Sequence, residues 1–279
     1  MKFTETSNEI KLQNPKNFDL GQTLDCGQCF RFEKLNEKRY KIIAFGKVLT
    51  LKQEINEIIF ENTTFEEFNS IWLKYFDIDT DYEKIKLSFP KNKFLQDAYD
   101  FCPGIRILNQ DPWETLCSFI ISQNNNIPRI KKIISKLCEL FGEKIGLSNS
   151  DFSFPSAKTI SSLSIEDLEP IKSGFRAKYI IDAAQKIESK KIDLDEISKL
   201  SLEEAQKLLM NINGVGPKVS MCVLLYGFHK LNAFPMDIWM KKVMNNYFEG
   251  KDPNWFGENC GIAQQYLYHY SRMNADKLF

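Results

Sequence analysis

The spacing of apolar residues changes along the chain and predicts two regions with different secondary structure. Over residues 1–62, apolar and polar positions alternate in short runs, which is typical of β-strands. The clearest runs are Cys29–Phe32, Tyr40–Phe45 and Lys47–Leu51, with Gly46 at a turn between the last two. These runs predict a small antiparallel sheet.

From Asp111 onward, apolar residues recur every three or four positions, as they do in amphipathic helices. Asp111, Pro112 and Glu114 favour a helix start, because they supply an N-cap, a first-turn proline and a capping-box carboxylate. We therefore predict an α+β fold. A small antiparallel-sheet domain with helices would occupy residues 1–105, and an all-helical domain would occupy residues 106–279.

One pair of predicted helices is separated by a glycine-rich turn. Ser201 and Glu204 predict the start of the first helix, and Pro217 suits the first turn of the second. Between them, Gly214 and Gly216 would let the backbone approach another molecule closely. The free amides at the start of the second helix would then suit a phosphate, although such turns also connect helices without any ligand.

Lys218 and Asp237 are the candidate reactive residues. Lys218 falls in the first turn of the second helix, where the helix dipole and partial burial both disfavour a cation. We therefore expect a neutral amine, which is a nucleophile at physiological pH. Asp237 follows in the tight turn Phe234–Asp237, which contains Pro235.

Composition narrows the function classes. The 279 residues are 43% hydrophobic and 27% charged, which is typical of a soluble globular protein. The formal net charge is zero, so nucleic-acid binding would require a local basic face. Two histidines argue against a multi-histidine metal enzyme or a Ser-His-Asp hydrolase. Seven cysteines and the absence of a signal-like segment predict reduced thiols and a cytoplasmic location, at the nucleoid in a prokaryote.

The hairpin, Lys218 and the Pro-x-Asp turn together resemble the helix-hairpin-helix Gly/Pro-Asp superfamily of base-excision DNA glycosylases. Four further segments resemble 8-oxoguanine DNA glycosylase/AP lyases of the eukaryotic type: Cys26–Arg31, Ser122–Arg129, Gly174–Tyr179 and Gly257–Tyr268. The resemblance covers nearly the whole chain. It implies a repair enzyme that flips and excises 8-oxoguanine through a lysine Schiff base and then cleaves the strand by β-elimination.

The resemblance also implies roles for single residues. Lys218 and Asp237 would be the catalytic pair. The Gly27 carbonyl would accept a hydrogen bond from N7–H of the oxidised base, which guanine lacks, and Gln264 would read the Watson–Crick edge. Three more residues complete the implied base pocket: Cys222 and Tyr268, which would sandwich the base, and Pro235.

Other residues are implied to contact the DNA. Asn124 would occupy the gap left by the flipped nucleotide, and Arg129 would contact the partner base, which favours cytosine. Phe175 stands where the family often has tyrosine, and Trp239 replaces the family's usual histidine. The remaining implied DNA contacts are Arg176 and the main chain at Gly214, Gly216 and Val219.

The expected partner is double-stranded DNA, bound by a monomer, and no cofactor is required for catalysis. The resemblance also implies a structural monovalent or divalent cation on the main-chain carbonyls of Met210, Ile212 and Val215. Two alternatives stay open. One is a non-catalytic helix-hairpin-helix DNA-binding module, and the other is a glycosylase for other damaged purines, such as alkylated bases. Glycosylases for alkylated bases keep the aspartate but lack the lysine.

Overall fold

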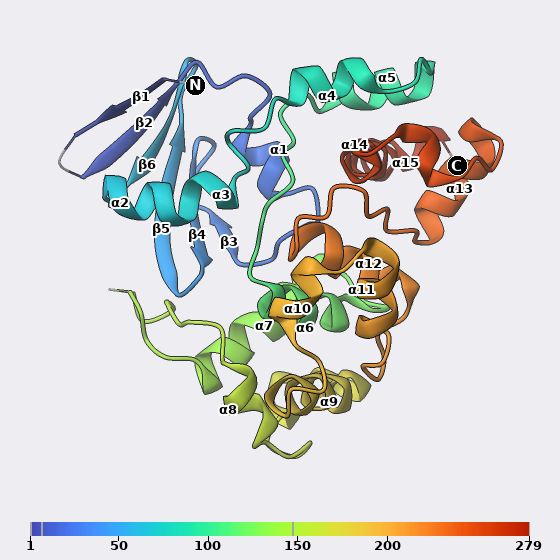
Figure 1. The fold of residues 1–279 in the computed structure, drawn as a ribbon. Coiled ribbons are helices and arrows are strands. Elements are labelled where there is room, and N and C mark those ends of the chain that lie inside the picture. Colours follow the sequence, from blue (N-terminus) through green and yellow to red (C-terminus); the bar gives the residue numbers. More distant parts are fainter. Residues whose placement is uncertain (1, 7, 147, 279) are drawn as a thin grey trace.

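The computed structural model describes residues 2–6, 8–146 and 148–278 of the chain. Within these residues, a six-stranded antiparallel sheet has the strand order β1-β2-β6-β5-β4-β3. The strands are β1 (Lys2–Glu5), β2 (Glu9–Gln13), β3 (Phe32–Lys34), β4 (Arg39–Ala44), β5 (Lys47–Gln53) and β6 (Glu57–Glu61). The sheet lies to one side of the helical mass (Figure 1), so the predicted α+β fold is confirmed.

The alternation in the sequence gives β4 and β5 their inward and outward faces. Buried and accessible positions alternate strictly along β4, and Phe45 and Gly46, both with positive φ, form the tight turn into β5. The strand predicted over Cys29–Phe32 is wrong in its bounds, because β3 begins only at Phe32. Pairing with β4 begins only at Phe32, opposite Ile42, while Cys29 and Phe30 are buried in two different hydrophobic cores.

The helices form the rest of the molecule. They are α1 (Leu20–Leu24), α2 (Phe65–Glu67), α3 (Leu73–Tyr75), α4 (Tyr82–Ser88), α5 (Lys93–Phe101), α6 (Pro112–Ser122), α7 (Ile127–Phe141), α8 (Ala157–Ser161), α9 (Ala177–Glu188), α10 (Leu194–Lys199), α11 (Leu202–Leu209), α12 (Pro217–Tyr226), α13 (Ile238–Phe248), α14 (Cys260–Met273) and α15 (Ala275–Leu278). A π-helical turn joins α2 to α3. None of the helices in the described ranges is both long and apolar enough to cross a bilayer.

Helix α6 lies at the centre of the helical part and packs against α7, α9 and α12 (Figure 1). Its start agrees with the sequence, because the Asp111 carboxylate accepts a hydrogen bond from the Glu114 amide at 2.8 Å. The expected return contact of a capping box is not made. The Glu114 carboxylate instead pairs with Arg31 at 3.1 Å.

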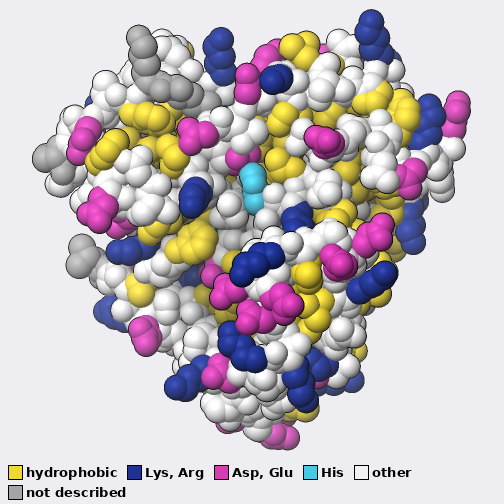
Figure 2. Space-filling view, viewed as in Figure 1, with side chains coloured by type: hydrophobic (Ala, Val, Ile, Leu, Met, Phe, Trp, Pro, Cys, Tyr) yellow, Lys and Arg dark blue, Asp and Glu magenta, His cyan; other side chains and the backbone are white. Residues whose placement is uncertain are grey.

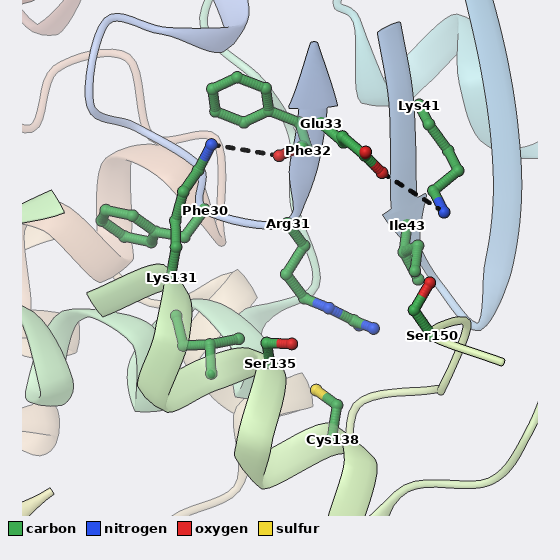
Figure 3. Close-up of a pocket in the computed structure, with 11 residues that line it drawn as sticks. Phe30, Arg31, Phe32, Glu33, Lys41, Ile43, Lys131, Ser135, Cys138 and Ser150 are labelled. Carbon is green, nitrogen blue, oxygen red and sulfur yellow. Dashed lines mark hydrogen bonds and ion pairs between the residues drawn. The ribbon is translucent and has the colours of Figure 1, made fainter. Parts of the chain in front are cut away.

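The sheet and the helical part meet at a seam between β3, β4 and α7. Figure 3 shows Lys131 reaching from α7 to the Phe32 carbonyl, a hydrogen bond of 3.1 Å, while the end of the Arg31 side chain points toward Ser150. A cavity of about 200 Å³ lies in this seam. Burial raises the pKa of Glu114 to about 7 despite the nearby Arg31 cation. The Arg31–Glu114 ion pair between the sheet region and the helical region therefore carries a large desolvation cost.

Candidate active site

The glycine hairpin between α11 and α12 has the local structure that its sequence predicts. Ser201 and Glu204 form a reciprocal capping box at the start of α11. Gly214 has φ of +79°, and a Cβ there would lie 2.4 Å from the Tyr179 ring. Gly216 is the N-cap of α12, and a Cβ there would meet no atom within 4 Å. The hairpin therefore packs inward through Gly214 and is open outward at Gly216.

Lys218 follows this open side on the first turn of α12. Its ammonium nitrogen lies 5.2 Å from the centroid of the Phe119 ring, and it hydrogen-bonds Cys222 one helical turn further on. Burial alone would lower the pKa of this ammonium, but the sulfur of Cys222 and the carboxylate of Asp237 hold the pKa above its ordinary value. The expectation of a neutral amine is therefore wrong for the DNA-free protein. The two neighbouring side chains outweigh the effect of burial.

Asp237 is fixed by the helix that it begins. It is the N-cap of α13, and its carboxylate accepts a hydrogen bond from the Met240 amide at 2.8 Å. This contact holds one carboxylate oxygen on the helix and sets the direction of the other. Asp237 and Lys218 line the same two adjoining cavities.

The inner cavity brings together every residue that the sequence assigned to catalysis or to the base. Its lining also includes Phe119 and Tyr226, and in full it consists of Gly27, Phe119, Lys218, Cys222, Tyr226, Pro235, Asp237, Gln264 and Tyr268. The volume is about 40 Å³. A space of that size holds a few water molecules but no purine. A base can enter only if the walls of the pocket separate.

Gly27 occupies one wall of this pocket in a conformation that favours glycine. Its φ is +88°, and a Cβ there would lie 3.4 Å from the Tyr268 ring and 3.3 Å from Nη1 of Arg272. The main chain of Gly27 can therefore lie against the base site without a side chain between them.

Gln264 presents a free acceptor to the same pocket. Its side chain is 3% exposed, and its Nε2 donates to the Pro235 carbonyl at 3.2 Å. Because a carbonyl can only accept, the amide orientation is fixed, and Oε1 is left buried with no hydrogen-bond partner among the described residues. A buried acceptor of this kind is costly unless a ligand supplies a donor. The Nε2 donor of Gln264, which the sequence analysis also assigned to recognition of the base, is already hydrogen-bonded to the Pro235 carbonyl.

The inner pocket opens into a larger cleft of about 790 Å³. The cleft is lined by Asn124 from the α6–α7 loop, by Gly216 from the hairpin, by Val219 from the first turn of α12, and by Trp239 from α13. The first-turn amides of α12 have no acceptor within their own helix, and glycine caps it without a side chain. The Lys242 ammonium nitrogen lies 5.7 Å from the centroid of the Trp239 ring at the same rim. These features suit the backbone of a nucleic acid.

Arg176 lies beneath the loop that carries Asn124. It is 3% exposed, and its guanidinium donates to the carbonyls of Gln123, Asn124 and Ser173. In the DNA-free protein these contacts hold the loop that carries Asn124, and the DNA contact implied for Arg176 stays a prediction. Asn124 itself has φ of +46°, a left-handed conformation that asparagine tolerates.

Arg129 and Phe175 lie outside both cavities. Arg129 is exposed on the first turn of α7, and its Nη2 lies 3.4 Å from the Lys172 carbonyl. Phe175 is 52% exposed, in edge contact with Tyr179. Both side chains are accessible to a ligand that extends past the cleft.

The hairpin carbonyls offer hard oxygen donors for a cation. The Ile212 carbonyl accepts a turn hydrogen bond from the Val215 amide at 3.0 Å, and a carbonyl oxygen has a second lone pair. Met210 and Val215 supply carbonyls in the same turn. Main-chain oxygens of this kind suit a monovalent or divalent hard cation, so the donor set fits the implied ion.

Sequence reasoning missed three aromatic members of the site. Phe119 and Tyr226 stack with ring centroids 5.4 Å apart beneath Lys218, and Phe30 lines the outer cleft. All three fall at apolar positions of a core pattern, so their spacing carries no signal that separates them from ordinary packing residues. Only the folded arrangement identifies them.

The surface in the orientation of Figure 1 shows Lys and Arg side chains interspersed with Asp and Glu (Figure 2), in agreement with a formal net charge of zero. No single sign of charge dominates this face. Attraction of a polyanion would therefore rest on the local features of the cleft.

The chain is similar to known proteins over almost its whole length. Residues 11–116 match the family "8-oxoguanine DNA glycosylase, N-terminal domain". Residues 117–254 match the family "HhH-GPD superfamily base excision DNA repair protein". An N-glycosylase/DNA lyase from Saccharomyces cerevisiae is 32% identical over 264 residues, covering 85% of this chain and 70% of the relative. A probable N-glycosylase/DNA lyase from Methanothermobacter thermautotrophicus is 30% identical and covers 77% of each chain.

A solved structure extends this similarity to the fold. The Clostridium acetobutylicum 8-oxoguanine glycosylase/lyase, in complex with dsDNA containing cytosine opposite to 8-oxoG, superposes with a TM-score of 0.93. The two chains are 36% identical, and the match covers 99% of each.

Proposed function

The chain belongs to the 8-oxoguanine DNA glycosylase family of the helix-hairpin-helix Gly/Pro-Asp superfamily, and from this membership we infer what it does. It is a DNA glycosylase that removes 8-oxoguanine from duplex DNA and an abasic-site lyase that cleaves the strand. The observation that carries this assignment is the inner pocket. It places a lysine and a carboxylate beside the Gly27 main chain and the unpartnered oxygen of Gln264.

The reaction begins when the lesion nucleotide leaves the duplex, because C1′ cannot be attacked while the base is stacked and paired. The outer cleft takes the strand, and the inner pocket widens to take the base. Oε1 of Gln264 accepts a hydrogen bond from a donor on the Watson–Crick edge, and the Gly27 carbonyl accepts one from N7–H. Guanine has no N7–H, so it leaves the Gly27 carbonyl without that partner.

Lys218 forms the covalent intermediate. Once its ammonium has lost a proton, the amine attacks C1′, the N-glycosidic bond breaks, and the bonding electrons leave with the base, which takes up a proton. Opening of the sugar ring then gives a Schiff base. Loss of the C2′ proton expels the 3′ phosphate by β-elimination. Asp237 stabilises the positive charge that develops on the sugar.

Arg129 and Phe175 are the residues that we propose for the partner strand. An arginine can donate to both acceptors of an unpaired cytosine, and the weak 3.4 Å contact of Arg129 with Lys172 is readily exchanged. The exposed ring of Phe175 supplies an apolar wedge but no hydroxyl. A preference for cytosine opposite the lesion follows from Arg129.

Three further properties are proposed on narrower grounds. A hard cation at the Met210, Ile212 and Val215 carbonyls would stiffen the hairpin without taking part in the reaction. The protein would act as a monomer, because one chain supplies the whole pocket. It would work in a reducing compartment such as the cytoplasm, because all seven cysteines are free and buried.

The test of this function is a comparison of substrates. Duplexes with 8-oxoguanine opposite cytosine, 8-oxoguanine opposite adenine and 3-methyladenine opposite thymine are incubated with wild-type protein and with Lys218→Gln. We expect base release and strand cleavage on the 8-oxoguanine duplexes, fastest opposite cytosine, and neither with Lys218→Gln. Release of 3-methyladenine alone would favour a glycosylase for alkylated bases. Binding without release from any duplex would favour a non-catalytic module.

A further inference from the structure

The loop that carries Gly27 is held by side chains from outside the base pocket. The Asp25 carbonyl accepts from Arg272, the Cys26 carbonyl from Gln265 at 3.0 Å, and the Gln28 carbonyl from Gln110 at 2.8 Å. Among the described residues, no donor is found for the Gly27 carbonyl. The one free acceptor in this run is therefore the group proposed to recognise the lesion.

Two of these contacts lead to the same residue, Tyr226. The Tyr226 hydroxyl donates to Oε1 of Gln265, and the Tyr226 main-chain carbonyl accepts from the main-chain N–H of Gln110 at 2.8 Å. Tyr226 is the last residue of α12, the helix whose first turn carries Lys218. The peptides on both sides of Gly27 are thus connected to the helix that bears the nucleophile.

The orientation of the Gln265 amide follows from its partners. The Cys26 carbonyl can only accept, so Nε2 must face it, and Oε1 must face the hydroxyl of Tyr226. Burial raises the pKa of Tyr226 well above its ordinary value, so this hydroxyl stays protonated and donates. Gln265 is 1% exposed and lies outside the lining of both cavities. It therefore acts on the base only through the loop.

We propose that Gln265, oriented by Tyr226, is a positioning residue that sets the direction of the Gly27 carbonyl and so the discrimination of oxidised from normal guanine. The proposal rests on the function inferred above for Gly27. If the Cys26 peptide loses its donor, the adjoining Gly27 peptide can rotate, because glycine at φ +88° meets little steric resistance. The carbonyl would then no longer be held in line with N7–H.

The test separates excision of the base from cleavage of an abasic site, which requires Lys218 but has no base to recognise. The main variant is Gln265→Met, which keeps the length of the side chain and removes the donor. Tyr226→Phe is the milder variant, because it keeps the ring stacked on Phe119. Tyr266→Phe is the matched control, since it removes another buried hydroxyl, from a residue of α14 that contacts the Ile105 carbonyl.

We expect Gln265→Met to lower kcat/KM for 8-oxoguanine excision about tenfold, the loss of one well-aligned hydrogen bond. Tyr226→Phe should lower it in the same direction, and Tyr266→Phe should leave it within about twofold of wild type. Cleavage of a preformed abasic duplex should be retained in Gln265→Met and in Tyr266→Phe. In a Lys218→Gln background, Gln265→Met should also reduce the preference for binding 8-oxoguanine duplex over undamaged duplex.

Three outcomes would overturn the proposal. Unchanged excision in Gln265→Met and Tyr226→Phe would show that the loop needs no such support. An equal loss of excision and abasic cleavage in Gln265→Met would show a general effect on the fold. Failure of the wild-type protein to excise 8-oxoguanine would instead remove the function on which the proposal rests, so the two failures are distinguishable.

Discussion

The charge state of Lys218 is decided by its neighbours, more than by its place on a helix. Burial and the dipole of α12 both disfavour the ammonium, yet Cys222 and Asp237 keep its pKa above the ordinary value. The sequence places Cys222 one helical turn away, but Asp237 is nineteen residues distant. Their combined effect is visible only once α12 and the start of α13 line one pocket.

A raised pKa of Lys218 predicts a pH dependence for the lyase reaction. The amine fraction rises about tenfold per pH unit below the pKa, so formation of the Schiff base should accelerate between pH 7 and pH 9. The measurement is the rate of borohydride trapping on a preformed abasic duplex at several pH values. A rate that does not change over this interval would mean that DNA binding itself lowers the pKa of Lys218.

The pocket residues with distinctive chemistry could be predicted from the sequence. Those whose positions resemble ordinary hydrophobic-core positions could not. Gly27, Gln264 and Asp237 stand in recognisable motifs, and the structure brings them together. Phe119 and Gln265 lie on helices whose pattern fits simple packing. Their importance depends on which atoms they face, and residue spacing does not encode that.

At the scale of elements, the hairpin uses its two glycines for different purposes. Gly214 requires a left-handed conformation and leaves room for the Tyr179 ring, whereas Gly216 faces open space with an ordinary φ of −99°. One glycine therefore serves the fold, and the other serves access to the ligand. The sequence shows both glycines but does not distinguish them.

Alanine at each glycine should separate these purposes. Gly214→Ala should reduce the free energy of unfolding by about 1–3 kcal/mol, because of strain at positive φ and contact with Tyr179. Gly216→Ala should leave this free energy nearly unchanged but weaken duplex binding, because a methyl group would stand between the backbone and a phosphate. Urea unfolding and duplex titration measure the two effects. Equal behaviour of the two variants would contradict the distinction.

Helix starts were the elements that the sequence predicted best. Ser201 and Asp111 accept hydrogen bonds at the expected amides, because N-capping depends on neighbours within three residues. The fate of the Glu114 carboxylate was not predicted, since its partner Arg31 is distant in sequence. Short β3 was also misplaced, because its bounds are set by pairing with β4, which begins only at Phe32.

At the scale of the whole molecule, the active site depends on parts that are distant in sequence. The wall with Gly27 follows the N-terminal α1, the nucleophile lies on α12, and Tyr268 lies on the C-terminal α14. The pocket exists only when the sheet region and the helical region pack together. The motifs in the sequence identify residues of the active site. The distances between these residues depend on the tertiary fold.

His269 on α14 links the stability of this assembly to pH. Burial and the Arg272 cation lower its pKa to about 4 from an ordinary 6.5, and Asp25 opposes the shift. Because the unfolded chain then binds more protons between these values, the free energy of unfolding should rise with pH from 4 to 6.5. The contribution lost on acidification is on the order of 1–3 kcal/mol.

His269→Phe should flatten this part of the pH profile, because phenylalanine does not titrate. Urea unfolding at pH values from 4 to 7 compares the slopes of the two proteins, and differences in absolute stability do not affect the comparison. Parallel slopes would mean that other groups account for the acid sensitivity.

The role of Lys218 as nucleophile is tested most directly by identifying the residue that becomes covalently bound to DNA. A duplex with one 8-oxoguanine opposite cytosine is incubated with the protein and borohydride, and the trapped complex is digested and sequenced by mass spectrometry. We expect a single adduct, on Lys218, and no trapped complex with Lys218→Gln. An adduct on another lysine, or undiminished trapping by Lys218→Gln, would contradict it.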